Sequence, residues 1–275
     1  MPFAPSGSVQ IFYETLGDPA DPPLVLIAGL GNQLLMWHDE FCHSLVDRGF
    51  FVIRHDNRDA GLSTIMADEQ PYSLSDMATD TVAVLDAAGV DRAHFVGHSL
   101  GGMIAQLVAI EHRARVATLT TISSSTGNFE YGAPTDEAMA AISRPPAGSI
   151  EAAIEGDVAS RRIWASPSWF DEGAAREYFR AAHERSFTPG ASMRQVATIL
   201  SASDREPLLA QLDVPALVIH GTLDPLIPPD GGRRTAELIP RAELMLVDGL
   251  GHDLPVQVWQ QVISAITAHV AAHAV

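Results

Sequence analysis

Short runs of consecutive apolar and β-branched residues recur along the chain and alternate with longer stretches of helical spacing. Most of the short runs are apolar at every position, which is typical of strands buried on both faces. The predicted strands are residues 9–15, 24–28, 50–54, 94–96, 116–122, 216–220 and 244–247, and the clearest predicted helices are 74–88, 100–111 and 256–270. This alternation predicts an α/β fold with a mostly parallel sheet and helices on both faces.

The alternation of strands and helices stops after residue 122. Residues 123–205 contain no convincing strand, but they carry Pro and Gly punctuation and helical stretches such as 173–185. We therefore expect a core built from residues 1–126 and 206–275, with residues 127–205 inserted as a helical lid over the edge of the sheet. A chain of 275 residues suits one α/β domain with such an insertion.

Charge and cysteine content narrow the possible partners and compartment. The chain carries 34 acidic and 17 basic residues, a formal net charge of −17, which repels phosphate backbones and anionic membrane surfaces at long range. No run approaches the ~18 apolar residues that span a bilayer, and the N-terminus lacks signal-peptide features. The lone cysteine, Cys42, excludes an intrachain disulfide. We expect a cytoplasmic protein that binds neither nucleic acid nor membrane; the sequence does not indicate its oligomeric state.

The segment Gly-His-Ser-Leu-Gly-Gly at 97–102 follows a predicted strand and precedes a predicted helix. In that setting the G-x-S-x-G pattern predicts a strained turn that presents Ser99 as a nucleophile, with flanking glycines relieving clashes. A plain strand-to-helix turn is the alternative, and a base and an acid in the appropriate order favour the catalytic interpretation. We expect His98 to be a packing or hydrogen-bonding residue.

A serine hydroxyl needs a base, and a neutral imidazole suits that role. His252 lies in a glycine-rich loop after the last predicted strand, so it is the candidate general base. Asp224 follows the strand at 216–220 and is the candidate acid that orients the histidine. Asp248 and Asp253 are nearer to His252 in sequence, but we expect them to be solvated or to cap the loop.

Backbone amides are predicted to stabilise the oxyanion. The candidates are the amide of Leu100, directly after the nucleophile, and that of Leu30, in a glycine-containing loop after the strand at 24–28. That loop lacks the remaining glycines of a dinucleotide fingerprint, so no nicotinamide cofactor is expected. His269 and His273 have a spacing that could bind a metal, but we expect both on a solvated helix face.

These segments and their order resemble the α/β-hydrolase superfamily over residues 9–126 and 206–273. The sequence at 56–63 looks like the family's Asp-x-Arg-x-x-Gly-x-Ser turn, and 214–221 looks like its stretch before the acid; both are expected to shape the fold and the pocket floor. The form of the turn, together with residues 17–22, is also similar to polyketide methylesterases of the aclacinomycin type.

The resemblance implies hydrolysis of a small-molecule ester through an acyl-enzyme on Ser99, with no metal or organic cofactor. A serine at this position argues against the haloalkane dehalogenase and epoxide hydrolase branches, which use a carboxylate nucleophile. Lactonase, carbon–carbon bond hydrolase and cofactor-free perhydrolase activities remain open. A non-catalytic small-molecule receptor and an interaction protein are the alternatives from other classes. Family members often begin the oxyanion loop with His-Gly, whereas this chain has Ala28, which leaves side-chain support of that loop in doubt.

The predicted lid contains several aromatic residues that could line a pocket or fasten the lid to the core. We expect packing for most of them, namely Trp164, Trp169, Phe170, Tyr178 and Phe179. Because no arginine clamp for a charged acid is evident, the expected substrate is a medium-sized, largely apolar ester.

Overall fold

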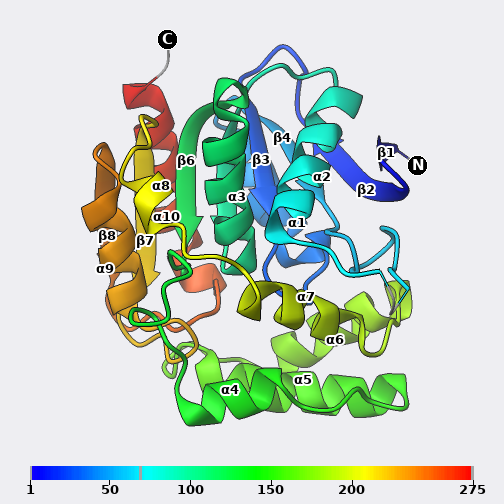
Figure 1. Ribbon diagram of the computed structural model, residues 1–275. Helices are drawn as coiled ribbons and strands as arrows, with labels where there is room; N and C mark the ends of the chain where they lie inside the picture. Colours follow the sequence, from blue (N-terminus) through cyan, green and yellow to red (C-terminus); the bar gives the residue numbers. More distant parts are fainter. Residues whose placement is uncertain (1, 68–69, 274–275) are drawn as a thin grey trace.

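The computed structural model describes residues 2–67 and 70–273, whose eight strands form one sheet in the order β1-β2-β4-β3-β5-β6-β7-β8 (Figure 1). The strands are β1 Phe3–Ser6, β2 Val9–Leu16, β3 Pro23–Ile27, β4 Phe51–His55, β5 Ala93–His98, β6 Val116–Ile122, β7 Ala216–Gly221 and β8 Ala242–Val247. The β1–β2 and β2–β4 pairs are antiparallel, whereas the pairs from β4 to β8 are parallel. The predicted α/β class is therefore confirmed.

Helices cover both faces of the sheet. Those of the core are α1 Asp39–Val46, α2 Leu74–Ala87, α3 Leu100–Glu111, α8 Glu206–Leu209, α9 Pro229–Leu238 and α10 Val256–Ala272. Alternate residues of β3 belong to different apolar clusters: Val25 and Ile27 pack with α2 and α3, whereas Leu24 and Leu26 pack with α1 and α10. This two-sided burial explains why a central strand such as β3 is apolar at every position.

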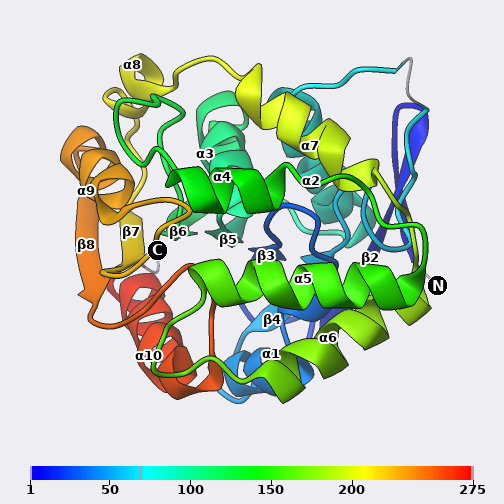
Figure 2. The ribbon, with the colours of Figure 1, turned by 90° about the horizontal axis from the view of Figure 1, so that it is seen from below.

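A helical insertion separates β6 from α8. It contains α4 Asp136–Ile142, α5 Ile150–Trp164, α6 Glu172–Arg185 and α7 Ala191–Leu200. Figures 1 and 2 show these helices lying across the carboxyl ends of the parallel strands. Ligand sites of open α/β sheets form at this edge.

Two ion pairs fasten the segment at 56–63 to the insertion. Asp56 accepts a hydrogen bond from Arg185 at 2.8 Å, and Asp59 one from Arg194 at 2.8 Å, with both carboxylates fully buried. The expectation for this segment was a role in shaping the pocket floor. The ion pairs show that this segment also anchors helices α6 and α7 of the insertion.

Two features differ from the sequence-based expectations. Strand β1 was not predicted; it contains Pro5, which suits an edge strand because proline cannot donate to a second neighbour. The solvated position expected for His269 is wrong, because this side chain is only 4% exposed. Among the described residues, no group of three or more histidine, cysteine, aspartate or glutamate side chains is arranged to hold a metal ion.

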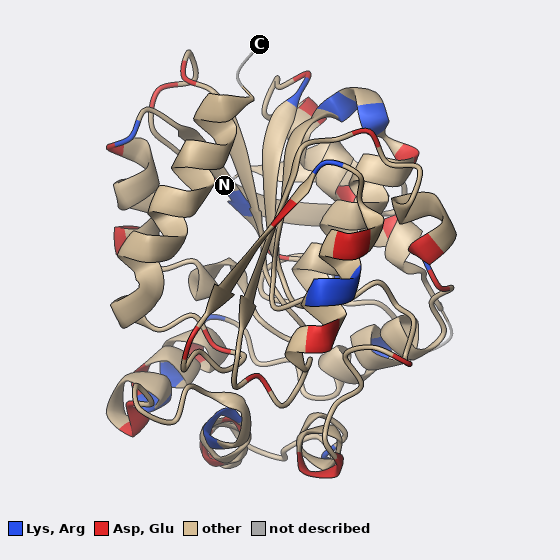
Figure 3. Ribbon diagram, turned by 90° about the vertical axis from the view of Figure 1, so that its left-hand side faces the viewer, with Lys and Arg blue, Asp and Glu red and all other residues tan. Residues whose placement is uncertain are grey.

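Both signs of charge occur on helices of the insertion (Figure 3), and α5 and α6 each carry Arg together with Asp or Glu. Within the described ranges, no helix has the length and apolar character needed to cross a bilayer.

Buried histidines predict loss of stability on acidification. Burial lowers the pKa of His55 and of His94 to about 4. An unfolded chain protonates its imidazoles near about pH 6.5. Since only the unfolded state takes up these protons between about pH 6.5 and about pH 4, the free energy of unfolding should fall there by up to ~1.4 kcal/mol per pH unit for each histidine.

Urea denaturation across this pH range measures the slope. His94→Asn is the matched variant, because an amide can keep the 2.9 Å hydrogen bond to Thr118 without titrating. Its slope should be shallower than that of the wild type. A free energy of unfolding independent of pH in this window would contradict the prediction.

Candidate active site

Ser99 lies in a strained turn between β5 and α3. Its backbone has φ 56° and ψ −120°, a conformation that non-glycine residues rarely adopt. A Cβ at Gly97 would lie 2.1 Å from the carbonyl oxygen of Gly101, and one at Gly101 would lie 2.1 Å from that of Ile27. No side chain fits at either position. The close packing of the backbone therefore explains both glycines of the G-x-S-x-G pattern.

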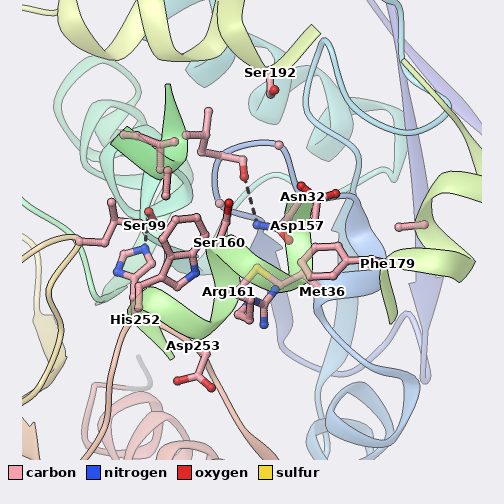
Figure 4. Close-up of a pocket in the computed structure, with 18 of the residues that line it drawn as sticks. Asn32, Met36, Ser99, Asp157, Ser160, Arg161, Phe179, Ser192, His252 and Asp253 are labelled. Carbon is pink, nitrogen blue, oxygen red and sulfur yellow. Dashed lines mark hydrogen bonds between the residues drawn. The ribbon is translucent and has the colours of Figure 1, made fainter. Parts of the chain in front are cut away.

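The structure brings together the three side chains singled out in the sequence. The Ser99 hydroxyl lies 3.0 Å from His252 Nε2, and the two side chains face each other in Figure 4. His252 Nδ1 lies 2.7 Å from Asp224 Oδ2. The other oxygen of Asp224 accepts hydrogen bonds from the amides of Leu226 and Ile227, both at 2.9 Å. A fully buried carboxylate is thus held in one orientation toward the imidazole.

Two further histidines surround this arrangement. His98 Nε2 donates to the carbonyl of His252 at 2.8 Å, in agreement with a hydrogen-bonding role. His220 Nε2 donates to the carbonyl of Ile227 at 2.7 Å and lies 3.6 Å from Asp224. Burial lowers the pKa of both imidazoles, that of His98 most strongly. Both rings therefore act as neutral hydrogen-bond donors. His220 was not singled out from the sequence, where only its place in the strand before Asp224 could have indicated it.

The amides of Leu30 and Leu100 flank Ser99 and have no hydrogen-bond acceptor among the described residues. The loop that carries Leu30 approaches Ser99 closely, since a Cβ at Gly29 would lie 3.2 Å from that of Ser99. The next amide, of Gly31, donates to Gln195 of the insertion at 2.8 Å. The amides of Leu30 and Leu100 thus belong to segments next to Ser99, and their role as oxyanion donors stays a prediction.

The loop that carries His252 is tied to the end of α5. The amide of His252 donates to the carbonyl of Trp164 at 2.7 Å. Ser166, which is fully buried, accepts from the amide of Gly251 at 2.8 Å and donates to Asp253 at 2.7 Å. Asp253 therefore joins the loop to the insertion, which is more specific than the capping or solvated role expected for it.

Asp248 accepts a hydrogen bond from the Thr222 hydroxyl at 3.1 Å, which joins the loop after β8 to the loop after β7.

A cavity of about 530 Å³ lies between the insertion and the core and includes Ser99 and His252 in its wall. The five aromatic residues named from the sequence all line this cavity: Trp164, Trp169, Phe170, Tyr178 and Phe179. Two of them also fasten the insertion to the core, because Trp169 packs against the core cluster and the Tyr178 hydroxyl donates to Asn32 at 2.8 Å. Met103, near Ser99, also lines the cavity, whereas Trp37 is fully buried in the core.

Charged side chains also line the cavity, which the sequence did not indicate. Asp157 on α5 binds both Arg144 and His183, the latter at 2.6 Å. Arg161, one turn further along α5, lies over the rings of Tyr178 and Phe179. The spacing of Asp157 and Arg161 on one helix could have indicated a shared face, but not that this face borders the cavity.

Comparisons with known proteins agree with this geometry. The family described as the alpha/beta hydrolase fold matches residues 22–188 and 195–257. Two rhodomycin D methylesterases, DauP from Streptomyces sp. (strain C5) and DnrP from Streptomyces peucetius, are 34% and 33% identical over 96% of this chain and 96% of their own. The esterase RhEst1 from Rhodococcus sp. ECU1013 superposes with a TM-score of 0.81 at 26% identity, over 99% of this chain and 98% of its own.

The hydrogen bonds of Ser166 predict an effect on the His252 loop. Ser166→Ala leaves the amide of Gly251 without its acceptor and removes one of the donors to Asp253, and an unsatisfied buried polar group costs about 1–3 kcal/mol. We expect kcat for an ester substrate to fall by ~10-fold. Steady-state kinetics and a thermal melt measure the two effects separately.

Ser168→Ala is the matched control, since Ser168 is exposed in the same loop. Equal kinetics for wild type, Ser166→Ala and Ser168→Ala would show that this link does not position the base.

Proposed function

The chain belongs to the α/β-hydrolase fold family and is a hydrolase, and we propose that it cleaves a carboxylic ester with Ser99 as nucleophile, His252 as general base and Asp224 as orienting acid. The observation that carries this proposal is the unbroken chain of hydrogen bonds from Ser99 to His252 and from His252 to Asp224. The named activity of the two methylesterase relatives and of the esterase structure supports an ester as substrate.

In the first half of the reaction, Ser99 Oγ attacks the ester carbonyl carbon while its proton passes to His252 Nε2. Asp224 stabilises the imidazolium that forms and holds the ring so that Nε2 faces the serine. The negative charge on the carbonyl oxygen is received by the free amides of Leu30 and Leu100. The bond to the alcohol oxygen then breaks, His252 returns its proton to that oxygen, and Ser99 retains the acyl group.

Water completes the cycle. His252 takes a proton from a water molecule, whose oxygen attacks the acyl carbon, and the same amides hold the second oxyanion. Breaking the bond to Ser99 Oγ releases the carboxylic acid and returns the proton to the serine. Each step uses groups that the chain itself supplies.

The cavity supports a medium-sized and largely apolar ester. Its volume of about 530 Å³ falls within the range of small-molecule sites, and its wall includes the aromatic residues of the insertion. We propose that residues 127–205 act as the lid that forms this wall. Lactonase, carbon–carbon bond hydrolase and perhydrolase activities would use the same three residues, but the methylesterase relatives favour an ester.

Hydrolysis of p-nitrophenyl esters from acetate to laurate tests the proposal. We expect wild-type turnover with an optimum at intermediate chain length, because the cavity of about 530 Å³ has room for a medium-sized acyl group. Ser99→Ala removes the nucleophile and should lower kcat by at least ~10³-fold. Asp224→Asn should cost ~10⁴-fold, since an amide no longer favours the productive tautomer.

Circular dichroism confirms that each variant is folded. Ester turnover that persists in folded Ser99→Ala would exclude Ser99 as the nucleophile. Absence of turnover on every ester by the wild type would favour one of the related activities or a non-catalytic receptor.

A further inference from the structure

Arg161 places a positive charge in the wall of the substrate cavity. It lies near the end of α5, is half-buried, and borders the same cavity as Ser99 and His252 (Figure 4). Its guanidinium carbon lies 5.6 Å from the ring centre of Tyr178 and 5.2 Å from that of Phe179. Contact with two ring faces restricts the orientation of a long side chain, so the cation is held in place before a substrate binds.

No carboxylate of the described ranges lies within ion-pair distance of Arg161. Asp157, one turn away on α5, is bound by Arg144 and by His183. Arg162, the next residue, points to the exterior, where its side chain is 61% exposed and pairs with Glu172. The two neighbouring arginines therefore differ: Arg162 pairs with a carboxylate at the surface, whereas Arg161 borders the cavity with no described carboxylate within ion-pair distance.

The groups that surround Arg161 are aromatic. The ring of His38 lies 6.0 Å from that of Tyr178 and 5.3 Å from that of Trp259, and all three border the cavity. Burial lowers the pKa of His38; the charges of Glu40 and Asp39 raise it, and the charge of Arg161 lowers it. None of the three rings carries a negative charge, and neither Glu40 nor Asp39 lies within ion-pair distance of Arg161 among the described residues.

We propose that Arg161 is a specificity-determining residue that binds an anionic oxygen of the substrate, so that the preferred ester carries an ionised group, a carboxylate or phenolate, next to an apolar or aromatic body. The inference rests on the proposed ester hydrolysis and specifies its substrate class. A guanidinium in a partly dehydrated site forms charge-assisted hydrogen bonds with such an oxygen. The surrounding rings accommodate the apolar part of the same molecule.

Two matched substrate series test the proposal. One contains mono-p-nitrophenyl esters of dicarboxylic acids from adipate to azelate, and the other contains the p-nitrophenyl esters of the monocarboxylic acids of equal length. In the wild type, kcat/KM for the acidic ester should exceed that for the neutral ester at one or more lengths. Arg161→Gln should lower this ratio by ~10-fold or more, mainly through KM, because a charge-assisted hydrogen bond is lost.

Two further variants separate charge from structure. Arg161→Lys keeps the charge and should retain part of the preference, whereas Arg162→Gln should leave the ratio as in the wild type. A wild-type preference for the neutral ester at every length would overturn the proposal. So would an acidic-to-neutral ratio that does not change in Arg161→Gln.

A binding measurement separates this proposal from the proposed function. Calorimetry with 4-phenylbutyrate and with 4-phenylbutanol compares an anion and a neutral molecule of similar shape in the wild type and in Arg161→Gln. Tighter binding of the anion that depends on Arg161, in a protein that hydrolyses no ester, would retain the anion site and reject the ester hydrolase. Equal binding of both molecules to the wild type would reject the anion site.

Discussion

Close backbone packing at the turn between β5 and α3 is the constraint on which the rest of the structure depends. Gly97 and Gly101 leave no room for side chains, and Ser99 is held with a positive φ because β5 and α3 meet without a spacer. Strand β5 lies between β3 and β6, and the Leu30 loop follows β3. Ser99 and the Leu30 loop therefore follow adjacent parallel strands, whose carboxyl ends meet at one edge of the sheet.

The helical insertion supports the same site that it covers. Its residues hold the His252 loop through Trp164 and Ser166, and the Leu30 loop through Gln195. Buried or partly buried ion pairs also join it to the segment at 56–63, and a buried carboxylate that loses its partner is strongly destabilising. The wall of the cavity and the loops that carry Leu30 and His252 are consequently joined by hydrogen bonds.

The sequence predicted the parts of the fold that have a local cause. Each predicted strand agrees with the structure to within two residues at either end, because a strand buried on both faces is apolar throughout. The candidate residues around Ser99 could be named from motifs and from chain order. Contacts between distant residues have no local pattern: Asp59 and Arg194 are 135 positions apart, and neither position alone indicates an ion pair. His269 was wrongly expected to be exposed, because a polar residue near the end of a helix usually lies at the surface.

The aromatic residues of the insertion show why the substrate could not be read from the sequence. Tyr178 and Phe179 lie on α6 among charged residues, and their spacing alone does not decide whether they face the core or a cavity. Only the packing of α5 against α6 shows that the rings line the cavity and that Arg161 lies over them. In a chain whose acidic residues outnumber its basic residues by 34 to 17, a cation facing a cavity without a carboxylate partner is not explained by surface solubility. Contact with ring faces stabilises a guanidinium by only about 0.5–1 kcal/mol at exposed sites, less than a charge-assisted hydrogen bond to an anion provides. The arginine is therefore oriented by the rings but not neutralised by them, which leaves its charge for a ligand.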